Sequence, residues 1–166
     1  MLIERPIKEG DSIVVGEYTG IVEKISVRPT RIQSFDHDDV IIPNSELIAG
    51  TVRNRTLTDR MTRIECAVGI AYDADVSLAF DTLYEIANNH PCTVRQPPPN
   101  VVMEQLGDSA LLLRLYCFID DVSNGLTTKS EMYREIVKTF RDLEIPIPFP
   151  QREIAILRGE ANSGAA

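Results

Sequence analysis

The chain has 166 residues, a formal net charge of −8, and a composition that is 43% hydrophobic and 25% charged. These values are typical of an ordinary globular protein that is large enough to bury a core without disulfide bonds or metals. The acidic balance argues against direct binding of nucleic acid or anionic lipid, because both are bound largely through cationic side chains.

Three widely spaced cysteines match neither a disulfide framework nor a metal-binding spacing. Cys66 and Cys117 fall in apolar, strand-like runs, so we expect buried free thiols and a reducing compartment. The N-terminal "MLIERPIKEGD" lacks the apolar core of a signal peptide. The longest apolar run, 110–119, contains Arg114 and is far shorter than the ~20 residues that span hydrocarbon. We therefore expect the chain, as given, to be soluble.

The first third of the chain predicts a small β-rich unit. Five strand-like runs, separated by turn residues, cover 11–16, 18–27, 30–35, 39–43 and 51–56. Gly20 lies inside the second run and predicts a sharp bend, as in a small sheet that curls into a barrel.

The stretch "DVIIPNSELIAG" (39–50) predicts a strand that stops at a short helical turn. Pro43 ends the strand because proline cannot donate to a β-ladder. Asn44 or Ser45 can cap the free amides of the turn that follows, and Gly50 can close it.

From residue 62 the pattern predicts strand, helix, strand, strand and helix. Asp75 can cap the first helix, which runs to Asn89, and two strands flank a turn at Gly107. The strand at 62–70 alternates, and the residues that share its apolar face are Ile64, Cys66, Val68 and Ile70. The second helix spans about 127–143. Its expected apolar face comprises Met132, Tyr133, Ile136, Val137, Phe140 and Leu143.

A ferredoxin-like domain needs one further strand, and "REIAILR" (152–158) is the candidate. The segment "IPIPFPQ" (145–151) intervenes, with three prolines at alternate positions that favour an extended, semi-rigid spacer. We therefore predict that the last strand leaves its own domain and pairs elsewhere.

No group of residues predicts an enzyme or a cofactor. His37 lies in the acidic turn "FDHDD", where a solvated hairpin tip is favoured over a metal site because no spaced ligand set joins it. His90 is favoured as a residue at a helix C-terminus. Ser45 has no histidine partner that would make it a nucleophile. Accordingly we predict no catalytic residue, no cofactor-binding residue and no metal ligand.

Several motifs occur in an order that resembles the small-conductance mechanosensitive channel (MscS) family, in the region that follows the pore helix. The segments "VGIAYDAD" (68–75), "LGDSALLLRLYCF" (106–118) and "IPIPFPQ" (145–151) are similar to later parts of the same family, so the resemblance covers roughly 4–158. The earlier motifs are Arg5-Pro6, Gly10-Asp11, Gly20-Ile21-Val22, Thr30-Arg31 and Ile42-Pro43-Asn44.

The resemblance implies a β + α/β fold. A small Sm-like β-barrel domain (1–61) would precede a ferredoxin-like α+β domain (62–150), a C-terminal strand (151–158) for a β-barrel between subunits, and a flexible tail (159–166). Arg5, Pro6, Gly10, Asp11, Gly20, Pro43 and Asn44 would be structural motif residues. The expected subunit contact comprises Glu153, Ile154, Ala155, Ile156 and Leu157.

The function implied by this family is that of the cytoplasmic vestibule of a tension-gated channel. The channel would be a homoheptamer in the inner (plasma) membrane, releasing ions and osmolytes on hypo-osmotic shock, and its membrane helices would precede this chain. We keep two alternatives open: a free-standing Sm-like or ferredoxin-like soluble module that binds a ligand or partner, and a hydrolase or transferase on an α/β scaffold. The second alternative lacks a recognisable site.

Overall fold

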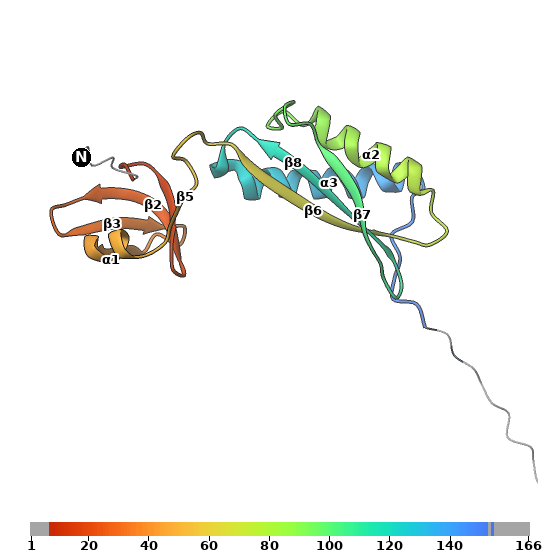
Figure 1. The fold of residues 1–166 in the computed structure, drawn as a ribbon. Coiled ribbons are helices and arrows are strands. Elements are labelled where there is room, and N and C mark those ends of the chain that lie inside the picture. The colour runs from red at the N-terminus through yellow and green to blue at the C-terminus, as the bar shows by residue number, and fades with distance from the viewer. Residues whose placement is uncertain (1–6, 153, 155–166) are drawn as a thin grey trace, which may run out of the picture.

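The computed structural model describes residues 7–152 and 154. It shows two folded units joined by a short linker (Figure 1). The first unit is built from strands and one short helix, and the second from three strands and two long helices. Six of the residues predicted from the family resemblance lie outside the described part of the chain: Arg5, Pro6, Glu153, Ala155, Ile156 and Leu157.

The first unit is a five-stranded antiparallel sheet in the order β4-β3-β2-β1-β5. Alternate apolar residues of these strands form a small core, with Ile13, Val22 and Ile32 almost completely buried. The strands are β1 (Ser12–Val15), β2 (Tyr18–Ile25), β3 (Pro29–Ser34), β4 (Asp39–Pro43) and β5 (Val52–Asn54).

The Sm-like β domain is therefore confirmed, with one correction. Among the described residues β4 and β5 are the two outer strands and do not pair with each other, so the sheet is open and not a closed barrel. A strand of only three residues at β5 offers few backbone groups for closure.

Gly20 has a different role from the bend expected there. It pairs regularly with Ile13 and Ser34, and the register of β2 against β3 shifts two residues later, between Val22 and Lys24. A Cβ at Gly20 would collide with the carbonyl oxygen of Gln33. Gly20 is therefore required for the close approach of β2 and β3.

The predicted helical turn is α1 (Asn44–Ala49), and it ends at Gly50, whose N–H donates to the carbonyl oxygen of Glu46. The predicted N-terminal cap is wrong. Pro43 occupies the capping position, and neither Asn44 nor Ser45 caps the first turn with its side chain. The side chain of Asn44 is instead used for longer-range hydrogen bonds, described below.

The second unit has the predicted order of strand, helix, strand, strand and helix. Its sheet is antiparallel in the order β6-β8-β7, and both long helices pack on one face (Figure 1). The elements are β6 (Thr62–Ile70), α2 (Val76–Asn89), β7 (Asn100–Leu106), β8 (Leu111–Ile119), a short 3₁₀ turn η1 (Val122–Asn124) and α3 (Gly125–Asp142).

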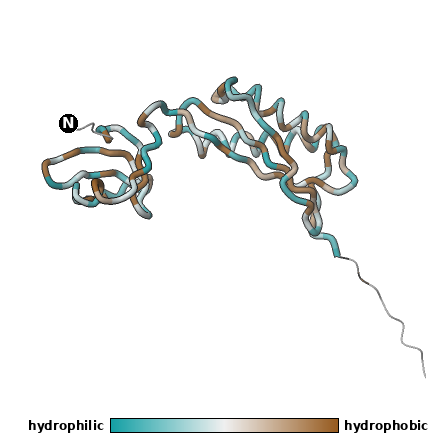
Figure 2. Tube along the Cα trace, viewed as in Figure 1, coloured by the Kyte–Doolittle hydropathy of each residue, from teal (hydrophilic) through white to brown (hydrophobic). Residues whose placement is uncertain are grey.

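The core of the second unit lies between the sheet and the two helices. The predicted inward residues of β6 are all buried, and they meet Leu113 and Leu115 of β8 and Phe140 of α3. Figure 2 shows the corresponding alternation of hydrophobic and hydrophilic positions along the tube. Within the predicted apolar face of α3, however, Val137 is 45% exposed and Leu143 is 44% exposed. Val137 lies on a flank of the helix, because a straight helix buries only one stripe, and Leu143 follows Asp142, the last residue of the helix.

After α3 the chain stays in contact with one end of the sheet, and most of the predicted last strand (151–158) lies outside the described residues. Ile145 is buried, and the Ala71 N–H at the end of β6 donates to the carbonyl oxygen of Pro146 at 2.9 Å. Further on, the Gln151 N–H donates to Ser109 Oγ, beside the β7–β8 turn. Within the described residues this segment is not a strand, and Ile154 is 81% exposed.

Candidate functional site

Asn44, the last residue of the "IPN" motif, fixes the neighbouring β2–β3 turn. Its Oδ1 accepts a hydrogen bond from Thr30 Oγ1 at 2.8 Å, and its Nδ2 donates to the carbonyl oxygens of Ser26 and Val27 at 3.0 and 3.2 Å. The Asn44 N–H also donates to the carbonyl oxygen of Arg28. Two motifs that are separate in the sequence, Thr30-Arg31 and Ile42-Pro43-Asn44, thus meet at one polar contact.

Asp11, from the Gly-Asp motif, ties the entry of the β domain to its exit. Its carboxylate accepts from Asn54 Nδ2 at 2.7 Å and from Thr56 Oγ1 at 3.3 Å. It also accepts from the N–H of Lys8, in a turn where Gly10 adopts a φ of 91° that favours glycine. This network holds the beginning of the described chain against the start of the linker.

The other end of the linker is bound to the α/β domain. Arg60 Nε and Nη2 donate to the two carboxylate oxygens of Asp121 at 2.9 and 3.0 Å, and Nη2 also donates to Ser123 Oγ. The hydrogen bond from Arg60 lowers the pKa of Asp121 to about 2. A bidentate pair of this kind fixes direction as well as distance.

The open face of the second sheet, opposite the helices, carries a charged network. Arg114 of β8 donates to Glu65 of β6 at 2.9 Å and to Glu104 of β7, so that one guanidinium links all three strands. Beside it, the guanidinium of Arg63 lies 4.9 Å from the ring centre of Tyr116, a cation–π contact. Opposite charges here largely neutralise each other.

The two histidines are where the sequence predicted them. His37 is exposed in the β3–β4 turn with a φ of 66°, and His90 ends α2. His90 Nδ1 accepts from the Cys92 N–H, and its Nε2 lies 3.2 Å from Glu131 Oε2. Because Nδ1 acts as the acceptor, the neutral ring carries its proton on Nε2 and donates it to Glu131.

Cys66 and Cys117 are buried free thiols, as expected from the sequence. Burial raises the pKa of each thiol to about 11, because the thiolate would lose its hydration. Such thiols are poor nucleophiles at neutral pH. Within 7–152 and at 154, no cluster of three or more histidine, cysteine or acidic residues could hold a metal ion.

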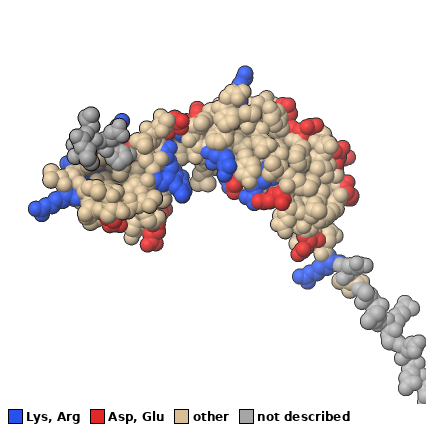
Figure 3. Space-filling model, in the orientation of Figure 1, with Lys and Arg blue, Asp and Glu red and all other residues tan. Residues whose placement is uncertain are grey.

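Sequence reasoning found the motif residues but missed several of their partners. Asn54, Thr56 and Ser123 gave no signal in the sequence, because each contact is made across the fold. Arg60 and Asp121 pair across 61 residues, a separation at which no local pattern predicts a contact. Figure 3 shows the acidic side chains along the side on which Figure 1 draws α2, and basic side chains near the linker.

Comparison with known proteins places these elements in one class, the mechanosensitive ion channels. The family described as "Mechanosensitive ion channel, beta-domain" matches residues 1–57. The family described as "Mechanosensitive ion channel MscS, C-terminal" matches residues 64–147. The chain therefore belongs to the MscS family of mechanosensitive channels, and the resemblance inferred from the motifs is confirmed.

Individual relatives and structures agree with this assignment. The chain is 34% identical over 154 residues to mechanosensitive channel MscK of Escherichia coli, covering 93% of this chain and 14% of that protein. It is 34% identical over 155 residues to small-conductance mechanosensitive channel MscMJ of Methanocaldococcus jannaschii, covering 90% and 43%. The closed-state crystal structure of Helicobacter pylori MscS superimposes with a TM-score of 0.85 at 23% identity, over 95% of this chain and 62% of that chain.

The likeness to the Helicobacter pylori structure, at this identity, concerns the fold alone. The chain spans 14% of the length of the Escherichia coli relative and 43% of the Methanocaldococcus jannaschii relative. No helix among the described residues is long and apolar enough to cross a membrane.

Proposed function

We propose that this chain is the cytoplasmic vestibule of a tension-gated channel that releases ions and osmolytes on hypo-osmotic shock. The observation that carries the proposal is the match of two successive MscS family segments to the two folded units, in the same order. In such a channel, membrane tension favours the state with the larger area in the membrane plane, which is a shift of populations. The vestibule contributes assembly and access to the pore.

We further propose that the channel is a homoheptamer in the inner (plasma) membrane, with this region on the cytoplasmic side. The proposed domain boundaries are 1–61, 62–150, 151–158 and 159–166. The described part of the proline-rich spacer after Ile145 contains no helix or strand, and Ile154 is 81% exposed. An apolar side chain in that position gains burial if the last strand pairs with the same strand of other subunits, which also removes an unpaired edge.

The proposal assigns no catalytic reaction to the chain, and it gives the acidic side chains a role in ion access. Each copy carries a net charge of −8, so a ring of copies would concentrate cations near its openings. Neutralising acidic residues that face the openings should therefore change ion selectivity. An unchanged selectivity would contradict this role of the charge without contradicting the vestibule itself.

The decisive experiment is functional expression of the gene, with its whole reading frame, in bacteria that lack their own mechanosensitive channels. We expect survival of hypo-osmotic shock, and pressure-activated currents in excised membrane patches. A control gene that lacks the codons for residues 7–152 should give neither. If the intact protein reaches the membrane but gives no pressure-activated current, the proposed channel function is wrong. If the protein is found only in the soluble fraction, a soluble binding module becomes the better explanation.

A further inference from the structure

The turn between β2 and β3 holds an apolar side chain in water. Val27 is 97% exposed, the highest value for a large apolar side chain among the described residues. We call Ser26, Val27 and Arg28 the β2–β3 tip. A single exposed valine is ordinary on a protein surface, so only the way in which it is held and surrounded can indicate a contact.

The β2–β3 tip is held in one conformation by hydrogen bonds. Asn44 Nδ2 donates to the carbonyl oxygens of Ser26 and Val27, and the Asn44 N–H donates to the carbonyl oxygen of Arg28 at 2.8 Å. Within the turn, the Ser26 N–H donates to the carbonyl oxygen of Pro29 at 2.9 Å. A segment that is already fixed loses little conformational freedom when another surface covers it, so the tip is prepared for a contact.

The charge around the β2–β3 tip is basic, although the whole chain carries −8. Lys24 and Arg28 are exposed, and neither forms an ion pair with a carboxylate among the described residues. The neighbouring carboxylate of Glu23 is already paired with Arg31. Figure 3 shows basic side chains at the end of the first unit that lies farthest from the linker. The tip therefore combines an exposed apolar side chain with unpaired positive charge.

The β2–β3 tip lies beside the segment through which the chain enters the β domain. This entry segment begins at Ile7, and its Glu9 Oε1 accepts from the Ile25 N–H at 3.0 Å, two residues before Val27. Lys8, between Ile7 and Glu9, is a further exposed cation. In the proposed channel the membrane helices precede this segment. The tip, which Figure 1 shows at the end of the β domain away from the α/β domain, then faces the membrane.

We propose that the β2–β3 tip contacts anionic phospholipid headgroups of the cytoplasmic leaflet, with Val27 among the headgroups and Lys24 and Arg28 on their phosphates. This inference rests on the membrane location in the proposed function and adds a lipid contact of the β domain itself. Binding at a membrane surface combines apolar burial with attraction of cations to the negative leaflet. The acidic side chains elsewhere in the chain oppose it little, because salt screens charges beyond about 8 Å.

Fluorescence quenching in the reconstituted protein tests the contact. Val27→Cys carries an environment-sensitive fluorophore, with Cys92→Ser in the same protein, since Cys66 and Cys117 are buried. The protein is produced from the whole reading frame and placed in vesicles of phosphatidylcholine and phosphatidylglycerol that contain a lipid with a spin-labelled headgroup. We expect quenching at least about twofold stronger than for the same label on Phe35→Cys. Phe35 is the matched control, because it is 65% exposed and follows the opposite end of β3.

The outcomes separate this contact from the proposed function. Equal quenching at the two positions, or none at Val27, would overturn the lipid contact. Emission from Val27 that shifts to shorter wavelength without quenching would also overturn it, because protein and not lipid would then cover the tip. Pressure-activated currents from the same vesicles leave the proposed function standing in each of these cases. A protein that does not enter the membrane contradicts the proposed function and this contact together.

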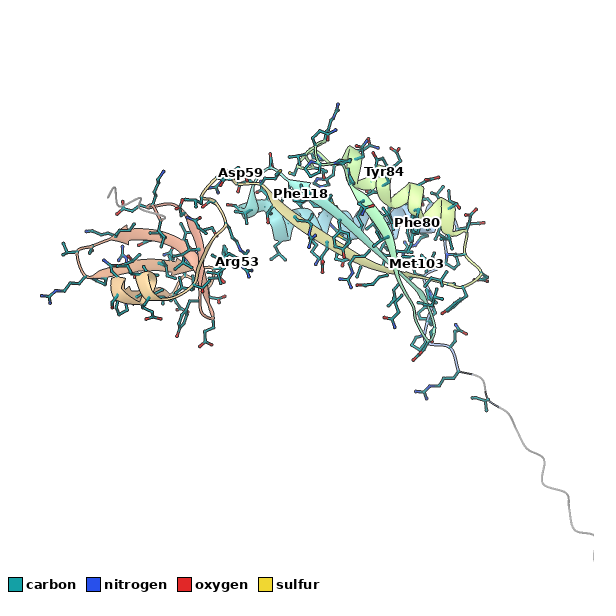
Figure 4. All side chains as sticks on the ribbon, viewed as in Figure 1. Arg53, Asp59, Phe80, Tyr84, Met103 and Phe118 are labelled. Atoms are coloured by element: carbon teal, nitrogen blue, oxygen red, sulfur yellow. The ribbon has the colours of Figure 1, made fainter. Side chains whose placement is uncertain are left out.

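Removal of the two cations gives an independent readout. Lys24→Gln combined with Arg28→Gln should lower the quenching at Val27 at least about twofold in vesicles with phosphatidylglycerol, and much less in phosphatidylcholine alone. Arg53→Gln combined with Arg63→Gln is the control, because it removes the same charge elsewhere and should leave the quenching unchanged. Arg53 lies at the linker end of the β domain (Figure 4), and Arg63 lies on β6. Equal losses from the two double changes would mean that only the overall charge matters, and the proposed contact would be wrong.

Discussion

The guanidinium of Arg60 holds the carboxylate of Asp121 in a bidentate pair, although the two residues are 61 positions apart. A backbone hydrogen bond joins the same two segments, because the Val122 N–H donates to the carbonyl oxygen of Arg60 at 2.9 Å. Arg60 belongs to the linker and Asp121 to the turn before α3. Together they fix the point at which the linker joins the α/β domain.

Replacing Arg60 with alanine should loosen the linker without unfolding either domain. We expect chymotrypsin to cut after Leu57 faster, by a factor on the order of two to five, because an exposed ion pair contributes little free energy. Limited proteolysis followed by mass spectrometry measures this rate. Arg53→Ala is the control, since exposed Arg53 precedes the linker and should leave the rate unchanged. Equal acceleration by both changes would mean that the pair does not fix the linker.

The stabilisation that the same pair contributes should be lost in acid. The pKa of Asp121 falls from 3.8 to about 2 in the folded protein, mainly through the hydrogen bond from Arg60. A lowered pKa stabilises the folded state above pH ~4, and this contribution is lost as the pH falls toward 2. We expect NMR titration of Asp121 to show the low pKa, and Arg60→Ala to move it back toward 3.8. A pKa near 4 in the unaltered protein would contradict the pair.

Replacing Asn44 with alanine should destabilise the β domain by about 1–3 kcal/mol. The change leaves the hydroxyl of buried Thr30 without its partner, and an unsatisfied buried polar group carries a cost of that size. It also removes two hydrogen bonds to exposed backbone carbonyls, which water can replace. Urea unfolding measures the difference. Ser45→Ala is the matched control, because Ser45 is exposed and does not cap α1. If Ser45→Ala costs as much, the helix start matters more than the Asn44 contacts.

Replacing Gly20 with alanine should push β2 away from β3. The added Cβ meets the backbone carbonyl of Gln33, which cannot move aside as a flexible side chain can, so we expect a loss of about 1–3 kcal/mol or more. Gly125→Ala is the contrasting control in α3. There the nearest atoms are 4.0 Å away, and alanine should stabilise the helix by up to about 1 kcal/mol. Thermal unfolding of both variants would test the contrast, and a neutral Gly20→Ala would refute the close approach.

The buried thiols should make the α/β domain less stable in alkali. In the folded state the pKa values of Cys66 and Cys117 are raised from 9.0 to about 11, so the unfolded thiols ionise first as the pH rises. Stability from this source is complete below pH 9 and is lost between pH 9 and 11, with a slope of at most about 1.4 kcal/mol per pH unit for each thiol.

Urea unfolding at several pH values, with and without both thiols, isolates this effect. The double change Cys66→Ala and Cys117→Ala should lower the free energy of unfolding at pH 7 through lost packing. It should also make the decrease in that free energy between pH 9 and 11 smaller. Cys92→Ala should leave the loss of stability between pH 9 and 11 unchanged, because Cys92 is only partly buried. If the unaltered protein and both variants lose the same stability between pH 9 and 11, other titrating groups are responsible for the loss.

Periodic features of this fold could be predicted from the sequence, and contacts across the fold could not. The alternation in β6 predicted its buried face, and Asp75 was correctly expected to cap α2, where its carboxylate accepts from the Leu78 N–H. Both signals are local. The partners of Asn44 lie up to 18 residues earlier in the chain, and its capping propensity pointed to the wrong hydrogen bond. Val137 was assigned to the core by its spacing, but the sheet beneath α3 covers only one stripe of the helix.

The anchoring of the linker at both ends limits how the two domains can move against each other. The Arg55 N–H donates to the carbonyl oxygen of Ser12, and Arg60 is held by Asp121, so both ends of the connection are anchored. Only a few residues around Leu57, Thr58 and Asp59 lie between these anchors, and each residue has two soft backbone torsions. Any tilt of one domain against the other must come from this small set of torsions. The connection is therefore a short hinge and not a long flexible linker, and its torsional stiffness sets how far the two domains can rotate against each other.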